Sequence, residues 1–135
     1  MLLGLGCDIM DVKRVADQLA SDPAVAHSLF TPAELNFCGE KRYPARHLAA
    51  RFAAKEALLK ALPGPRLSSI PWHEMEVTCG ASGRPTLTLS GSLRLLAAQL
   101  AVTSIHLSLS HTEHSAMAVV VLETTAGATN PASIP

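Results

Sequence analysis

Apolar residues recur with the spacing of a strand near both ends of the chain and with the spacing of a helix between them. Leu2 to Ile9 is an apolar run in which Gly4 and Gly6 would let another backbone approach closely, so we predict a strand there. Near the other end, Ser104 to Ser110 alternates between apolar and polar residues, and Ala116 to Leu122 is continuously apolar. Both patterns predict strands, and the turn residues between them predict a hairpin.

Helix signals fill the segment after the first strand. Asp11 can cap a helix over Val12 to Ala20, and Thr31-Pro32-Ala33-Glu34 has the composition of a capping box that opens a second helix. The longest helix is predicted from Pro44 to Leu62, because Pro63-Gly64-Pro65 stops it.

Two strands and a helix complete the pattern, over Trp72 to Thr78, Pro85 to Leu89 and Gly91 to Leu100. The order strand, three helices, two strands, helix, two strands predicts an α+β fold, with a small, mostly antiparallel sheet packed against a long buried helix. Residues 1–123 form the predicted domain. Residues 124–135 are small, polar and Pro-containing, and we expect a disordered tail.

The long helix carries charges on an otherwise apolar surface. On a wheel of 100° per residue, Lys55 falls inside a leucine stripe, and Glu56 and Lys60 fall between the leucine and alanine sides. Such charges are costly unless they are paired or bind something. Taken alone, Glu56 and Lys60 could form an i,i+4 surface ion pair, and the Lys55 stem could carry its ammonium past the leucines to water.

Composition narrows the classes of protein. The formal net charge is zero, which argues against nucleic acid as a partner, and the longest apolar run is too short to cross a membrane. Only 16% of the 135 residues are charged, so we expect extra surface to be buried against other subunits. Cys7, Cys38 and Cys79 are widely spaced and no signal peptide precedes them, which together indicate reduced thiols and a cytoplasmic location.

Three separate segments could supply one site. Asp8 ends the first predicted strand, Glu56 and Lys60 lie on the long helix, and His111 ends the strand after Ser108-Leu109-Ser110. Taken alone, Asp8 could be a cap or turn residue and His111 a turn histidine. Together, two carboxylates suit Mg²⁺, which commonly takes one or two protein carboxylates and completes its shell with water and substrate phosphate. Nearby Lys and His side chains would balance phosphate charge.

At this point the chain resembles the bacterial holo-acyl-carrier-protein synthases, which are small 4′-phosphopantetheinyl transferases. The likeness runs from about residue 2 to residue 122. It is carried by these motifs: Gly4-Leu5-Gly6-Cys7-Asp8-Ile9 with Arg14; Phe30-Thr31 with Glu34; Arg51-Phe52-Ala53-Ala54-Lys55-Glu56-Ala57 with Lys60-Ala61; Gly83-Arg84-Pro85; and Ser108-Leu109-Ser110-His111 followed by Ala116 to Val121.

The resemblance implies transfer of the phosphopantetheine arm of coenzyme A to a serine of an acyl carrier protein, with release of adenosine 3′,5′-bisphosphate, in support of fatty-acid or polyketide synthesis. It implies that Asp8 and Glu56 hold Mg²⁺ and that Glu56, Lys60 and His111 are catalytic, with Glu56 the candidate base. It also implies a homotrimer with active sites between subunits.

By the same resemblance, six residues would line the coenzyme A pocket: Arg51, Lys55, Lys60, Gly64, Pro85 and His111. Lys13 and Arg14 would contact the carrier protein. The sequence departs from the family in two places. Pro63 and Pro65 remove two backbone N–H donors from a turn that is often Gly-rich, so we expect fewer nucleotide contacts there. Asp17 and Asp22 lie on the first helix and the turn after it, where relatives are often basic, so we expect a weaker or different carrier dock.

Three alternatives stay open. A non-catalytic coenzyme A or carrier-protein binding module would explain the proline turn. A metal-dependent hydrolase could use His106, His111 and His114 as ligands, although their spacing repeats no metal motif. A cysteine nucleophile is the third, although Cys7 lies in an apolar strand and Cys38 has no evident base partner.

Overall fold

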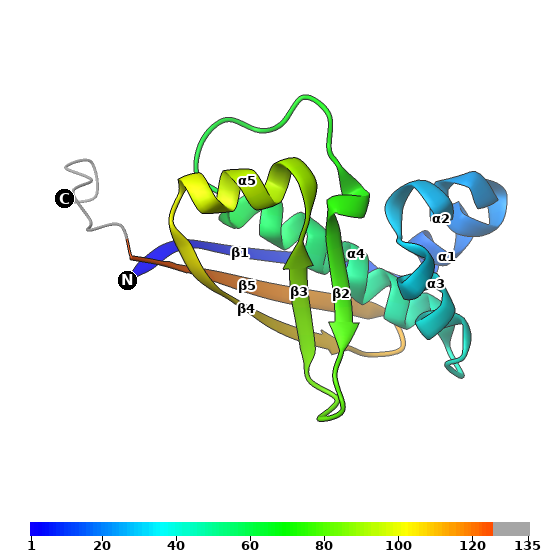
Figure 1. Cartoon of the computed structure of the whole chain (residues 1–135). Helices are drawn as coiled ribbons and strands as arrows, with labels where there is room; N and C mark the ends of the chain where they lie inside the picture. Colours follow the sequence, from blue (N-terminus) through cyan, green and yellow to red (C-terminus); the bar gives the residue numbers. More distant parts are fainter. Residues whose placement is uncertain (126–135) are drawn as a thin grey trace.

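A three-stranded antiparallel sheet and one long helix organise the computed structural model, which describes residues 1–125. Strand β5 (Ser115–Thr124) lies between β1 (Leu2–Asp11) and β4 (Val102–His111), and α4 (Pro44–Ala61) lies across one face of these strands (Figure 1). The predicted hairpin between the last two strands is confirmed, as are the α+β class and the buried long helix.

A second, smaller layer covers the other side of α4. Strands β2 (Met75–Cys79) and β3 (Pro85–Leu89) form a separate two-stranded antiparallel sheet beside helix α5 (Gly91–Gln99). The core cluster joins Ala and Leu side chains of α4 to side chains from both sheets, because the helix is enclosed between them. The prediction of one sheet was therefore incomplete, since the strands within residues 1–125 form two sheets.

Three short helices pack at the N-terminal end of α4: α1 (Val12–Ser21), α2 (Pro23–Leu29) and α3 (Pro32–Gly39) (Figure 1). Both predicted caps are confirmed, since Asp11 accepts from the N–H of Arg14 and Thr31 forms a capping box with Glu34. The prediction of strand from Trp72 was wrong at its start, because Trp72–Glu74 is a turn of 3₁₀ helix.

Two strand ends lie beyond their predicted positions. The ladder between β1 and β5 continues to the pair Asp11 and Ser115, so Asp8 lies inside its strand rather than at its end. Strand β5 includes Thr124, which is buried, so residue 124 belongs to the domain and not to the tail. Thr125, also in the predicted tail, donates its N–H to the carbonyl oxygen of Ala101, and residues 126–135 lie outside the described residues. Among the residues described, no helix has the length and apolarity to cross a bilayer.

Strand β1 packs directly on α4, as the glycine pattern predicts. A Cβ atom added at Gly4 would overlap the carbonyl oxygen of Ala61, and one added at Gly6 would overlap that of Ala57. Two residues further along the same side of the strand comes Asp8, whose side chain is therefore held against the helix.

Candidate functional site

Asp8 on β1 and Lys60 in the last turn of α4 form the centre of the site. The Lys60 ammonium lies 2.8 Å from Oδ1 of Asp8 and donates to the carbonyl oxygen of Cys7 at 3.1 Å. The hydrogen bond to Asp8 raises the pKa of Lys60, with help from the charges of Asp8 and Glu56, so the ammonium stays charged. Within residues 1–125, Oδ2 of Asp8 is buried and has no hydrogen-bond partner.

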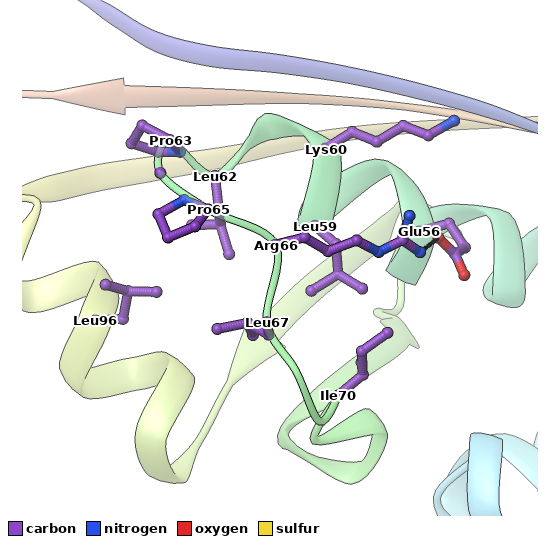
Figure 2. A pocket seen from close by; sticks show the side chains of 11 residues that line it. Glu56, Leu59, Lys60, Leu62, Pro63, Pro65, Arg66, Leu67, Ile70 and Leu96 are labelled. Atoms are coloured by element: carbon purple, nitrogen blue, oxygen red, sulfur yellow. Dashed lines mark ion pairs between the residues drawn. The ribbon is translucent and has the colours of Figure 1, made fainter.

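Glu56 lies one helical turn before Lys60 and points into a pocket of about 250 Å³ (Figure 2). Its side chain is only 18% exposed, and Oε2 lies 3.8 Å from Nη2 of Arg66. The polar side of this pocket comprises Glu56, Lys60, Gly64 and Arg66, and the apolar side comprises Leu59, Leu62, Leu67, Ile70 and Leu96. The alternative of an i,i+4 ion pair between Glu56 and Lys60 is not observed, since Lys60 pairs with Asp8 and Glu56 lies beside Arg66.

The carboxylates of Asp8 and Glu56, with Lys60 beside them, fit a divalent cation that binds together with a phosphate ligand. Oδ2 of Asp8 is a buried carboxylate oxygen without a partner, a costly arrangement that a cation would relieve. No cluster of three or more His, Cys, Asp or Glu ligands exists among the described residues. Two carboxylates completed by water and phosphate suit Mg²⁺ better than a structural zinc ion.

A second pocket, of about 470 Å³, contains three other predicted residues, Arg51, Pro85 and His111. The His111 ring lies edge-on to that of His47, with 5.0 Å between their centroids. Arg51 lies over the Phe37 ring and donates to the carbonyl oxygen of His47. Partial burial lowers the pKa of His47, and the charge of His111 lowers it further, so the site favours neutral His47.

Lys55, predicted to lie near coenzyme A, instead lies in the protein core. Its ammonium is 2.6 Å from Oε1 of Glu34 and donates to the carbonyl oxygens of Leu29 and Trp72, which uses all three of its N–H groups. Burial lowers its pKa and Glu34 opposes this effect. The structure therefore assigns Lys55 to the scaffold, because a buried ammonium must be fully paired.

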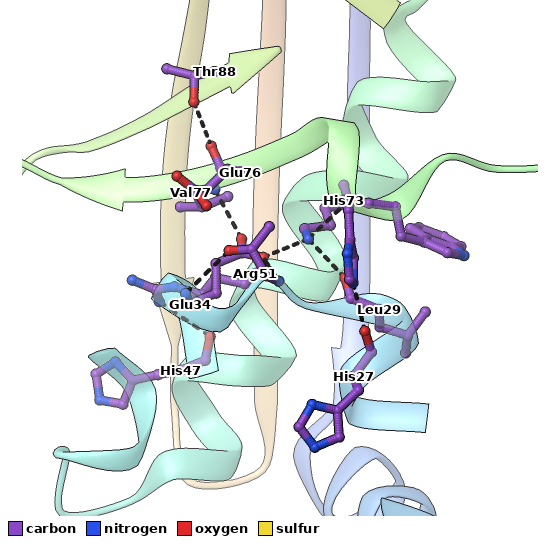
Figure 3. Close-up of polar contacts among 12 residues, drawn as sticks. His27, Leu29, Glu34, His47, Arg51, His73, Glu76, Val77 and Thr88 are labelled. Carbon is purple, nitrogen blue, oxygen red and sulfur yellow. Dashed lines mark hydrogen bonds and ion pairs between the residues drawn. The ribbon is translucent and has the colours of Figure 1, made fainter. Parts of the chain in front are cut away.

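Glu34 is the important residue that sequence reasoning did not assign. Besides Lys55, its carboxylate accepts from the N–H of Thr31 at 2.9 Å and, through Oε2, from that of Val77 at 2.9 Å (Figure 3). It thereby ties α3 to α4 and β2. In the sequence, Glu34 stands out only in the capping box and beside Phe30-Thr31 in the family motif, and neither signal predicts its pairing with Lys55.

The predicted carrier-protein residues lie on α1. Lys13 is exposed and pairs with Asp17 at 2.6 Å, and this hydrogen bond raises the pKa of Lys13. The side chain of Arg14 is exposed next to it. The ion pair with Asp17 reduces the positive field that α1 presents.

The structure disfavours the histidine metal site and the Cys38 nucleophile. His106, His111 and His114 do not gather: His106 pairs with Glu123, His111 contacts His47, and His114 lies beside Glu113. Cys38 is buried, and burial raises the pKa of its thiol to about 11, which makes it a poor nucleophile.

Comparison with known proteins gives the family. The model of the 4′-phosphopantetheinyl transferase superfamily (ACPS) matches residues 4–120. The chain belongs to this superfamily. Among curated relatives, the holo-[acyl-carrier-protein] synthase of Clavibacter sepedonicus is 46% identical over 91% of this chain and 97% of its own, and that of Frankia casuarinae is 44% identical over 91% and 98%.

Solved structures of the superfamily share the fold. The coenzyme A complex of the ACPS from Chronobacterium ammoniagenes superposes with a TM-score of 0.80 at 28% identity, and covers 90% of this chain and 96% of that one. Family and relatives together make this chain a phosphopantetheinyl transferase. The predicted family is confirmed.

Proposed function

We propose that this transferase moves the 4′-phosphopantetheine arm of coenzyme A onto a serine of an acyl carrier protein, depends on Mg²⁺, and releases adenosine 3′,5′-bisphosphate. The observation that carries the proposal is the buried, unpaired Oδ2 of Asp8 next to Lys60 and the Glu56 pocket. Coenzyme A is the bound ligand in the Chronobacterium ammoniagenes complex, and its diphosphate is the anion that such a site suits.

In the proposed reaction, the serine oxygen attacks the diphosphate phosphorus that carries pantetheine. The new P–O bond forms as the bond to the adenosine-bearing phosphate breaks, and the serine proton passes to a base, for which Glu56 is our candidate. Mg²⁺, held by Asp8 and Glu56, would neutralise charge on the phosphates. Lys60 keeps its proton and is placed to neutralise charge that develops on the leaving group.

Apart from Lys55, the candidate coenzyme A residues lie in two separate pockets. Gly64 and Lys60 line the pocket with Glu56, whereas Arg51, Pro85 and His111 line the other. We propose that the complete site forms between two copies of the chain, where the first pocket of one copy faces the second pocket of its neighbour. The positively charged and imidazole groups of the second pocket suit the phosphates of coenzyme A.

An uncovered apolar sheet face supports assembly into a trimer. The face of the three-stranded sheet opposite α4 exposes Leu5, Ile9 and Met117. Apolar residues that gather on one open face of a sheet mark a contact surface. A homotrimer would bury this face and bring the pockets of neighbouring copies together.

The carrier protein would dock beside the serine-attack site, at Lys13 and Arg14 on α1. An acidic carrier helix suits exposed cations, and the Lys13–Asp17 pair predicts modest affinity with a strong dependence on salt. We place the reaction in the cytoplasm, in agreement with the three free cysteines.

The test is the intact mass of an apo acyl carrier protein after incubation with the enzyme, coenzyme A and Mg²⁺. A gain of one phosphopantetheine group that disappears with a chelator and returns with added Mg²⁺ supports both the transfer and the metal. The nucleotide product is identified in the same mixture by chromatography. Transfer that persists in chelator contradicts the metal assignment, and no transfer to fatty-acid or polyketide carrier proteins contradicts the function.

A further inference from the structure

Arg66 is the one charged residue of the Glu56 pocket that neither the resemblance nor the proposed chemistry uses. Its side chain is 78% exposed, and its guanidinium reaches back to the largely buried Glu56 carboxylate (Figure 2). Pro65, directly before it, fixes one backbone torsion, and Gly64 adopts φ 102°, a left-handed value. Pro65 restricts the backbone directly before Arg66, whereas the Arg66 side chain extends into solvent.

The same turn lacks backbone donors that an anionic ligand could use. Pro63 and Pro65 have no N–H, so the wall of the pocket beyond α4 can offer few main-chain hydrogen bonds to phosphate. Arg66 follows these prolines and brings five N–H donors in a planar fork that matches phosphate oxygens. The Arg66 side chain therefore offers the hydrogen-bond donors that the backbone of this turn lacks.

The Glu56 carboxylate cannot pair with Arg66 and bind a metal ion at the same time without loss to one of the two interactions. In the described structure each carboxylate of the site has a cation beside it, Lys60 at Asp8 and Arg66 at Glu56. A divalent cation on Glu56 would repel the guanidinium, which then becomes free to pair with the ligand phosphates in the same pocket.

We infer that Arg66 is a positioning residue that holds Glu56 in the free enzyme and moves to the coenzyme A phosphates when the metal and coenzyme A bind. This inference rests on the proposed function. It predicts opposite effects of one substitution: loss of Arg66 removes a competitor for the metal and, at the same time, a ligand for coenzyme A. If Arg66 formed only a surface ion pair, its loss would not tighten metal binding and weaken coenzyme A binding together.

The experiment measures two affinities on the full chain. Mn²⁺, a paramagnetic substitute for Mg²⁺, is titrated without coenzyme A and its free concentration is read by electron paramagnetic resonance. Coenzyme A is then titrated calorimetrically at saturating Mg²⁺. Arg66→Ala should bind Mn²⁺ about two- to fivefold more tightly, as expected for removal of an exposed ion pair. It should bind coenzyme A about three- to tenfold more weakly, as expected for lost charge-assisted hydrogen bonds.

Two variants act as controls. Arg94→Ala removes an exposed arginine on α5 that does not line the pocket, and both affinities should stay at the wild-type value. Arg66→Lys keeps the charge without the fork and should fall between wild type and Arg66→Ala for coenzyme A. Melting temperatures of all variants check the fold.

An unchanged or weaker Mn²⁺ affinity in Arg66→Ala, or an unchanged coenzyme A affinity, overturns the inference. If the wild-type enzyme still modifies a carrier protein, that result leaves the proposed function intact. A wild-type enzyme that neither binds Mn²⁺ nor transfers the arm overturns both.

Discussion

Lys60 holds one oxygen of Asp8 at 2.8 Å and leaves the other buried without a partner. The two residues are 52 positions apart, and they meet because Gly4 and Gly6 bring β1 against the last turns of α4. The pair fixes the orientation of the carboxylate before any ligand arrives. This preorganisation is what phosphoryl transfer requires, since alignment and charge neutralisation account for most of its catalysis.

Gly6→Ala should destabilise the fold and weaken transfer. Its Cβ would overlap the carbonyl oxygen of Ala57, so β1 must move away from α4 and take Asp8 with it. Overpacking of this kind costs about 1–3 kcal/mol of unfolding free energy, measured by chemical denaturation. Gly80→Ala is the control, because nothing lies within 4 Å of its added Cβ, and it should leave stability almost unchanged. Equal stabilities of the two variants would contradict the close packing.

Lys55→Met should cost about 3–5 kcal/mol of unfolding free energy, because it leaves the Glu34 carboxylate buried without its cation. Adding Glu34→Gln removes the stranded charge, and the double variant should recover part of the loss. In contrast, Lys13→Met breaks an exposed pair that water already screens, and it should leave stability almost unchanged. A double variant no more stable than Lys55→Met would argue against the ion pair as the source of the effect.

Local sequence patterns predicted most of the helices and strands. The features they did not predict depend on contacts between residues far apart in the sequence. The caps at Asp11 and Thr31 and the length of α4 depend on residues close in sequence, so their signals could be read directly. The ladder that carries β1 to Asp11 depends on β5, more than a hundred residues later, and no local signal predicts it.

The candidate site also has a part that local sequence predicts and a part that depends on distant contacts. Asp8, Glu56, Lys60 and His111 could be selected as unusual charges on apolar elements. The environment of Lys55 depends on Glu34, 21 positions away, and a buried ammonium and a ligand-binding one look alike in sequence. That the candidate residues separate into two pockets is a property of the tertiary structure alone.

His47 should make the fold sensitive to mild acid. Burial and the neighbouring His111 lower its pKa below the ordinary 6.5, so the unfolded chain binds a proton more readily than the folded one. The resulting stability is present above pH 6.5 and is lost as the pH falls towards the folded pKa. The melting temperature of His47→Gln should therefore fall less than that of the wild type between about pH 7.5 and about pH 5.

His114→Gln removes an exposed histidine between β4 and β5 and should keep the wild-type pH dependence. If His47→Gln loses as much stability in acid as the wild type does, the partially buried neutral imidazole is not the cause.

Mixed subunits test whether the two pockets of one site belong to different copies. Asp8→Asn and His111→Ala should each be almost inactive alone. A site is intact when the copy that supplies Asp8 is His111→Ala and the neighbour that supplies His111 is Asp8→Asn. With equal amounts mixed at random in a trimer, about a quarter of the sites meet this condition. Unfolding and refolding the two variants together should therefore restore about a quarter of the wild-type rate. No recovery despite confirmed mixed trimers would place both residues in one subunit's site.

The mass of an apo acyl carrier protein, measured after incubation with coenzyme A, Mg²⁺ and either wild-type enzyme or Asp8→Asn, tests the central claim most directly. The account predicts a gain of one phosphopantetheine group with the wild type, which a chelator abolishes, and almost none with Asp8→Asn at an unchanged melting temperature. Equal modification by both enzymes, with or without chelator, would contradict it.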